Sequence, residues 1–182
     1  MSLIRYALLS LLSREPLSGY DIKLQMNRFS PFWKAGSNQI YPELAKMEKE
    51  GLIQLQRVEQ HTHRPARKIY EITTAGQDSL IEWTIAPGEL DRIRDDFLIK
   101  VYNSWLIEPD KMIGRITDVK QQHEERLHEY EDKLVELREM VQGMDDKAPL
   151  ISSISVIEFG VEYEQLYIKW CEKLMSQLEP TK

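Results

Sequence analysis

The chain of 182 residues contains a pair of adjacent β-prone segments, and helical patterns lie on both sides of this pair. Residues 52–58 and 67–73 partly alternate apolar and polar side chains, and the polar segment between them contains Pro65. Two short alternating runs joined by such a turn predict a β-hairpin. The first half of the chain is therefore expected to consist of helices and one small antiparallel β-hairpin.

Two helices are predicted at the beginning of the chain. Residues 3–13 are apolar on nearly all sides, which is typical of a buried helix, and the pattern ends before Pro16. Ser18 and Asp21 have the spacing of a capping box, in which a hydroxyl and a carboxylate satisfy each other's backbone N–H groups. We expect a second, amphipathic helix to follow and to end at about Phe29.

A third helix is predicted directly before the hairpin. Ser37 is the expected N-cap, Glu50 the expected end, and Gly51 the left-handed residue that closes the helix. Pro42 indicates either an irregular first turn or a start nearer Tyr41, because proline cannot donate a backbone hydrogen bond.

A fourth helix follows the hairpin, capped by Thr74 and Gln77 and ending before Pro87. Three helices, a hairpin and a helix are the order of a winged helix-turn-helix. In that fold the N-terminal residues of the second helix of the pair reach base edges in the major groove of DNA. Here that helix is the one that begins at Ser37.

The residues in these positions suit DNA. Asn38 and Gln39 can pair with the edge of adenine, and serine commonly donates to phosphates or bases. The segment 57–68 is rich in arginine, lysine and histidine, so the wing can neutralise phosphates. The expected DNA-contacting residues are Ser18, Tyr20, Ser37, Asn38, Gln39, Tyr41, Lys46, His63, Arg64, Arg67 and Lys68. Taken singly, Asn38 and Gln39 could instead cap a helix, and a basic hairpin tip is usually a solvated turn.

Charge is unevenly distributed. Residues 1–86 carry 11 basic and 9 acidic side chains, whereas residues 87–182 carry 13 basic and 21 acidic ones, within a net charge of -6. An acidic total normally disfavours nucleic acid, but the local charge decides the encounter. The local positive charge of the wing is therefore compatible with DNA binding, despite the negative net charge of the chain.

The first half resembles the PadR family of bacterial transcriptional regulators. The resemblance covers about residues 3–86 and is carried by ALLSLLSREPLSGYDIK (7–23), Trp33, NQIYPELAKMEKEGLI (38–53) and RKIYEITTAGQDSLIEW (67–83). The acidic second half, entered through RDDFLIKVY (94–102), is similar to the C-terminal domain of longer members, which virulence-activator regulators share. The wing tip, residues 60–64, matches no motif of the family.

The resemblance implies a homodimeric DNA-binding regulator. Members are often repressors of their own promoters, and small phenolic or apolar effectors release some of them. Four aromatic residues are the expected lining of an effector site between the two halves: Trp33, Trp83, Tyr102 and Trp105. The alternative for each is an ordinary core or interface position.

The second half is predicted to be all helical, with a first helix over residues 91–107. Pro109 begins a long helix in which core-tolerant residues recur at steps of three and four, with one stutter at His123. We interpret His123 as a polar residue that sets the register of a coiled-coil-like pairing. A last helix, from Ser152 or Ser155 to Leu178, has more apolar surface than one side needs.

This excess of apolar surface predicts packing between two copies of the chain. The expected dimerisation residues are Ile116, Val119, Leu127, Tyr130, Leu134, Leu137, Tyr163, Leu166, Trp170 and Leu174. A dimer would set two recognition helices one DNA turn apart, about 34 Å, over a pseudo-palindromic operator.

Motifs for enzyme chemistry are absent from the sequence. It contains no phosphate-binding loop, nucleophile elbow or zinc-protease motif, so we expect no enzyme, no cofactor and no metal. Cys171 is interpreted as a core or interface thiol, and His61 and His63 lack a third ligand nearby. No apolar run is long enough to span a membrane, and with a single cysteine this predicts a cytoplasmic protein.

The sequence thus predicts a mainly α protein in two parts. Residues 1–86 are expected to form an α+β winged helix-turn-helix that binds DNA. Residues 87–182 are expected to form a helical, coiled-coil-like dimerisation domain. The function predicted is regulation of transcription by a homodimer, most simply as a repressor of a nearby promoter. The competing hypothesis is a protein–protein adaptor that does not read DNA.

Overall fold

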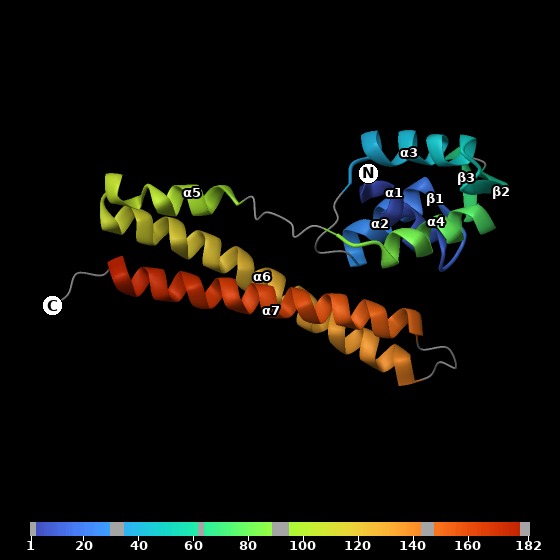
Figure 1. Cartoon of the computed structure of the whole chain (residues 1–182). Helices are drawn as coiled ribbons and strands as arrows, with labels where there is room; N and C mark the ends of the chain where they lie inside the picture. Colours follow the sequence, from blue (N-terminus) through green and yellow to red (C-terminus); the bar gives the residue numbers. More distant parts are fainter. Residues whose placement is uncertain (1–2, 30–34, 62–63, 89–94, 143–147, 179–182) are drawn as a thin grey trace. The chain divides into compact units, whose positions relative to one another are not determined.

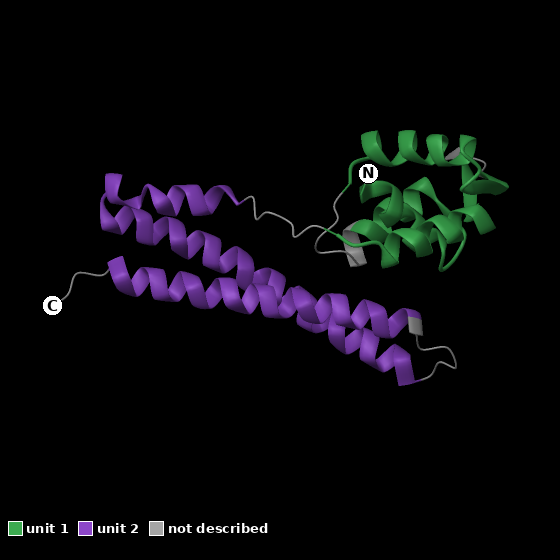
Figure 2. Ribbon diagram, in the orientation of Figure 1, with its two compact units in different colours: residues 1–89 green, residues 90–182 purple. Residues whose placement is uncertain are grey.

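The structure is a computed structural model that describes residues 3–29, 35–61, 64–88, 95–142 and 148–178. The chain divides into two compact units, residues 1–89 and 90–182 (Figure 2). The described residues are mainly helical with one small antiparallel sheet, which confirms the predicted fold class.

Unit 1 has the element order of a winged helix. Its elements are α1 (Leu3–Leu12), β1 (Leu17–Ser18), α2 (Gly19–Phe29), α3 (Ser37–Lys49), β2 (Ile53–His61), β3 (Arg64–Ile72) and α4 (Thr74–Ile85) (Figure 1). The sheet has the order β1-β3-β2, and both pairings are antiparallel. Sequence analysis did not predict β1, because a strand of two residues has no periodicity to detect.

The hairpin is longer than predicted. β2 and β3 pair from Ile53 and Ile72 at the base to His61 and Arg64 at the tip. Pro65, expected in the turn, therefore lies within β3. Proline is tolerated there because the register shifts between Glu59 and His61, and the pairing with β1 reaches only Ile69 and Tyr70.

The core of unit 1 forms around α1, which contacts α3, α4 and β3. Leu8, Leu9 and Leu12 of α1 are almost fully buried. The stripe of α3 that faces this core recurs every three or four residues and consists of Ile40, Leu44 and Met47. The remaining faces of α3 are left for solvent or a partner.

The two ends of α3 are well defined. Gly36 is its N-cap and Ser37 its first residue, so the predicted N-cap is wrong by one position. The helix continues through Pro42 without a later start, at the loss of one backbone hydrogen bond. Gly51 has φ +74°, as predicted, and the Leu52 N–H donates to the Met47 carbonyl at 3.0 Å, which is a Schellman closure.

The start of α4 also differs by one residue from the prediction. Thr73, and not Thr74, is the N-cap, and its hydroxyl accepts from the Gly76 N–H at 3.1 Å. The same hydroxyl donates to the Gly51 carbonyl at 2.6 Å. The end of α3, the base of the wing and the start of α4 are therefore held together at one point.

Unit 2 consists of α5 (Asp96–Tyr102), the short 3-10 helix η1 (Ser104–Leu106), α6 (Pro109–Gln142) and α7 (Ala148–Leu178). The single helix predicted over 91–107 is wrong: α5 ends at Tyr102, and residues 91–94 lie outside the described residues. The Asn103 side chain donates to the Ile99 carbonyl at 2.8 Å and competes with the backbone for that acceptor. None of the described helices is long and apolar enough to cross a membrane.

The long helices α6 and α7 lie side by side as an antiparallel pair (Figure 1). The buried residues of α6 are Met112, Ile116, Val119, His123, Lys133, Leu134 and Leu137. Met112, Ile116 and Val119 belong to an apolar cluster with residues of α5 and α7, and Leu134 and Leu137 belong to a second cluster with α7. The seam thus packs within one chain.

The packing of α4 on the wing predicts a strong effect of Gly76→Ala. A Cβ at Gly76 would lie 2.1 Å from the Leu52 carbonyl oxygen and 2.8 Å from Ile72 Cγ1, so the backbone at Leu52 would have to shift. We expect a loss of roughly 1–3 kcal/mol in the free energy of unfolding, measured in urea. Gly88→Ala is the matched control, because a Cβ at Gly88 meets nothing within 4 Å. Equal stability of the two variants would contradict this packing.

Candidate nucleic-acid interface

The candidate site begins where β1 passes into α2. The Ser18 hydroxyl donates to Asp21 Oδ2 at 2.6 Å and accepts from the Asp21 N–H at 3.2 Å. The Ser18 N–H also lies 3.4 Å from Asp21 Oδ2, so the predicted capping box is confirmed. This reciprocal bonding fixes the first turn of α2, from which Tyr20 projects to solvent.

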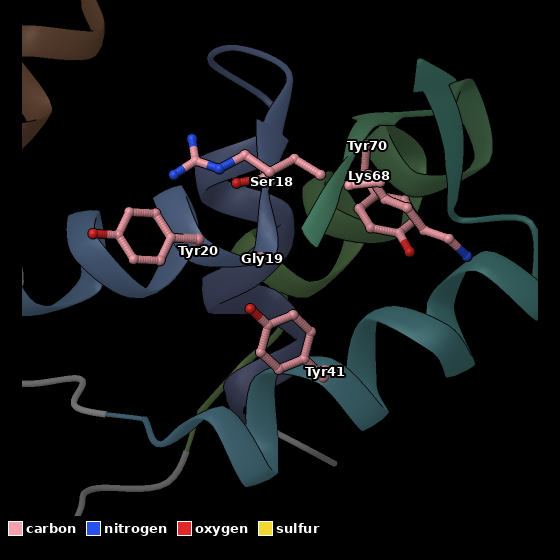
Figure 3. Close-up of a pocket in the computed structure, with 8 residues that line it drawn as sticks. Ser18, Gly19, Tyr20, Tyr41, Lys68 and Tyr70 are labelled. Atoms are coloured by element: carbon pink, nitrogen blue, oxygen red, sulfur yellow. The ribbon is translucent and has the colours of Figure 1, made fainter. Parts of the chain in front are cut away.

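An open cleft of about 650 Å³ lies between this turn, α3 and β3 (Figure 3). Its lining residues are Ser18, Gly19, Tyr20, Tyr41, Ala66, Arg67, Lys68 and Tyr70. Five of them are among the predicted DNA-contacting residues, drawn from three separate segments. The fold therefore brings the α2 turn, the N-terminal half of α3 and the middle of β3 to one place.

Arg67 joins the wing to α2. Its guanidinium lies 4.7 Å from the centre of the Tyr20 ring, and its Nη1 lies 3.6 Å from Asp21 Oδ1. Asp21 thus bonds Ser18 through one carboxylate oxygen and pairs with Arg67 through the other. Sequence analysis did not find this role of Asp21, because the two residues are far apart in the chain and no local pattern links them.

Tyr41 is positioned by a glycine. A Cβ at Gly19 would lie 2.6 Å from Tyr41 Cε1, so the tyrosine ring lies against the backbone of the α2 turn. Figure 3 shows the Tyr41 hydroxyl directed toward Gly19, with Tyr20 at one side. Both rings are about half exposed, at 54% for Tyr20 and 52% for Tyr41. They offer aromatic surface and hydroxyl donors at the rim of the cleft.

The first turn of α3 presents two polar side chains to solvent. Asn38 and Gln39 are exposed and Ser37 is partly buried. Gln39 Oε1 accepts a hydrogen bond from the Gly36 N–H at 3.2 Å, so in this structure the Gln39 side chain caps its own helix. Asn38 Oδ1 would lie 2.4 Å from a Cβ at Gly36, so the Asn38 side chain extends back over the N-cap.

The remaining predicted DNA-contacting residues are described only in part. Lys46 and Lys68 are exposed, on α3 and β3 respectively. His63 lies outside the described residues, and of Arg64 only the backbone, in β3, is described. The cationic surface that the structure describes on the wing is therefore Arg67 and Lys68, with Arg57 paired to Glu59 at 3.0 Å.

The four aromatic residues predicted for an effector site do not share one environment. Trp83 packs against the core of unit 1 and stacks on Tyr6 at 4.4 Å between ring centres. Tyr102 and Trp105 belong to unit 2 and are 83% and 78% exposed. Trp33 lies outside the described residues.

The predicted dimerisation residues differ in how far they are buried within unit 2. Ile116, Val119, Leu134 and Leu137 are buried, and six others are partly buried or exposed: Leu127, Tyr130, Tyr163, Leu166, Trp170 and Leu174. Of the ten, only Leu166 is largely exposed, at 67%.

His123 and Cys171 are both core residues of unit 2. His123 Nδ1 bonds the carboxylate of Glu164, which is 3% exposed, and its ring stacks on Tyr167 at 3.7 Å. Tyr167 in turn donates to Asp95 at 2.6 Å. Burial raises the pKa of the Cys171 thiol to about 11, which opposes a redox-sensing role. Among the described residues, no group of three or more His, Cys, Asp or Glu could hold a metal ion.

Two family models match this chain, one for each unit. Residues 8–82 match the transcriptional regulator PadR-like family, and residues 93–179 match the virulence activator alpha C-terminal domain. The matches agree with the division of the structure into a winged helix and a helical pair.

Known relatives are similar over the full length. The negative transcriptional regulator PadR of Bacillus subtilis is 28% identical over 181 residues, which cover 98% of this chain and 99% of that protein. The crystal structure of Bacillus subtilis PadR in complex with operator DNA has a TM-score of 0.86, 26% identity, and coverage of 98% and 99%. The complex of Bacillus subtilis PadR with p-coumaric acid has a TM-score of 0.78, 26% identity, and coverage of 98% and 100%.

Proposed function

The chain belongs to the PadR-like family of transcriptional regulators, not to a family of enzymes, and we propose that it represses a nearby promoter by binding a specific double-stranded operator as a homodimer. The observation that carries the proposal is the cleft between α2, α3 and β3. It lies beside an exposed helix turn with base-reading side chains, so backbone and base contacts can be made together.

The cleft suits a DNA phosphate. Lys68 and Arg67 supply cations, and the Tyr20 and Tyr41 hydroxyls supply neutral donors at its rim. Arginine, lysine and tyrosine are common partners of phosphate oxygens. Asp21 competes with a phosphate for Arg67, and their separation of 3.6 Å indicates a loose pair that a phosphate can replace.

The first turn of α3 supplies the sequence reading in this proposal. Asn38 is exposed and can offer both an amide donor and an amide acceptor to adenine. Gln39 can do the same after its bond to Gly36 is exchanged for one to a base. A similar protein, Bacillus subtilis PadR, has been crystallised with operator DNA, which supports the proposal that this chain binds DNA.

The experiment compares Lys68→Ala and Asn38→Ala in fluorescence anisotropy. The probes are a labelled duplex from upstream of the protein's own gene and a scrambled duplex of equal composition, each at several salt concentrations. Lys68→Ala should weaken binding to both duplexes and reduce the salt slope by about one unit. Asn38→Ala should cost about 1–3 kcal/mol on the upstream duplex alone. Lys169→Ala, on α7, controls for the loss of one positive charge.

Other outcomes contradict the proposal. Equal binding of the wild-type protein to both duplexes, lost at higher salt, means phosphate contact without sequence reading. No binding to either duplex at low salt favours the protein–protein adaptor.

We propose that the homodimer forms through unit 2. Because the most deeply buried seam residues of α6 pack against α7, we propose that the dimer surface includes the exposed apolar residues of the helical pair. Leu166 is the exposed member of the predicted set, and further exposed apolar residues lie on α6 and α7: Val135, Met140, Ile151 and Phe159. Scattered apolar residues are normal on a surface, but a concentration on two helices is typical of an interface.

Leu166→Glu tests this dimer surface. A charge buried at the interface without a partner should shift the protein from dimer to monomer in sedimentation equilibrium, with an increase in the dimer dissociation constant of at least about tenfold. Gln165→Glu, at the adjacent exposed position, introduces the same charge and should leave the dimer intact. A dimer unchanged by Leu166→Glu would place the interface away from this face of α7.

We propose, third, that a small aromatic or apolar effector releases the DNA. Bacillus subtilis PadR has been crystallised with p-coumaric acid, and the exposed Trp105 and Tyr102 of this chain offer aromatic surface. Millimolar p-coumaric acid should lower the anisotropy of the complex with the upstream duplex and change tryptophan fluorescence. Sodium acetate at equal ionic strength is the control. A panel of aromatic acids that alters neither signal contradicts effector release.

A further inference from the structure

Arg5 of α1 contacts two carboxylates, that of Glu43 in α3 and that of Glu50, the C-cap residue of α3. Its Nε donates to Glu43 Oε1 at 2.8 Å, and its Nη1 lies 2.8 Å from Glu50 Oε2. The Arg5 side chain is 19% exposed and that of Glu43 is 13% exposed, so the contact is largely withdrawn from solvent. The hydrogen bond to Glu43 is the main cause that raises the pKa of Arg5. The guanidinium is therefore charged wherever the protein is folded.

The third nitrogen of Arg5, Nη2, is buried without a hydrogen-bond partner among the described residues. Burying an N–H group without a hydrogen-bond partner costs free energy. The guanidinium of an exposed arginine would avoid this cost by donating to water. The guanidinium is held where it is by the two carboxylates and the surrounding packing. A lysine at this position has a single ammonium and cannot reproduce the planar fork that reaches both partners.

The two carboxylates lie on one side of α3. Glu43 and Glu50 are seven residues apart, which is almost two turns, so they project in nearly the same direction. Tyr41 projects about 160° away around the helix and rests against Gly19. The buried stripe of Ile40, Leu44 and Met47 lies between these two flanks. Contacts on both flanks oppose rotation of α3 about its own axis.

We propose that Arg5 is a positioning residue that sets the rotation of α3 and so aims Asn38 at the bases without touching DNA. This inference rests on the proposed function. Bidentate pairing with a base edge depends on the direction of the side chain, so even a small rotation of α3 weakens it. Lys68, a charged partner of the phosphate in this proposal, belongs to β3 and so depends less on that rotation than Asn38 does. Loss of Arg5 therefore lowers discrimination between sequences more than it lowers affinity for DNA in general.

The test uses Arg5→Lys, Arg5→Met and Glu50→Gln in the full chain. Urea unfolding at the temperature of the binding assay first shows that each variant is folded in the absence of urea. Anisotropy then gives the ratio of dissociation constants for the scrambled and upstream duplexes. The ratio should fall roughly tenfold in Arg5→Lys, and further in Arg5→Met. Affinity for the scrambled duplex should stay within about twofold, with an unchanged salt slope.

Glu50→Gln tests one partner of Arg5, and Arg115→Lys is the matched control. Glu50→Gln keeps the shape of one partner and removes its charge, so it should give a smaller fall in the same ratio. Arg115→Lys makes the same substitution on α6 of unit 2 and should leave the ratio unchanged. If the Arg5 variants do not fold, Glu50→Gln decides the question by the same ratio.

A folded Arg5 variant with the wild-type ratio would overturn the inference, and so would equal weakening on both duplexes. Lower stability with unchanged discrimination would likewise mean that Arg5 only stabilises unit 1. The proposed function fails separately: a wild-type protein that binds the two duplexes equally contradicts it before any variant is compared.

Discussion

Burial of one face of α3 against α1 is the constraint on which the candidate interface depends. Ile40, Leu44 and Met47 are at most 1% exposed, and they leave the first turn of the helix facing outward. The Schellman closure at Gly51 then turns the chain directly into β2. Because α3 and the wing share this junction, fixing the helix on the core also fixes where the cations of β3 lie relative to it.

In unit 1, one of the cations that could bind a phosphate is paired with a carboxylate of the same unit. The cleft is cationic through Arg67 and Lys68, yet Asp21 lies beside Arg67 and bonds Ser18 at the start of α2. The carboxylate is needed to cap the helix, and it also lowers the positive charge available to a phosphate. In the proposed function, such a site would favour DNA that supplies several phosphates and base contacts together, which is the condition for selectivity over simple charge attraction.

Local patterns predicted most of the fold. The capping box at Ser18 and Asp21, the left-handed Gly51 and the proline start of α6 each have short-range signals, and each is found in the structure. Contacts between distant residues have no such signal. The pairing of Arg67 with Asp21, the bond of His123 to Glu164 and the strand β1 depend on tertiary packing. The heptad pattern of α6 was detected, but periodicity cannot say whether the seam packs against α7 or another chain.

Selection of binding sites by the full-length protein from a pool of randomised duplexes tests the central claim most directly. A homodimer that reads bases through the first turn of α3 predicts an enriched pseudo-palindrome. Its two half-sites should be centred about 10–10.5 base pairs apart, or a multiple of that spacing. A pool that shows no enriched motif after repeated rounds, despite retained binding at low salt, would contradict sequence reading by this winged helix.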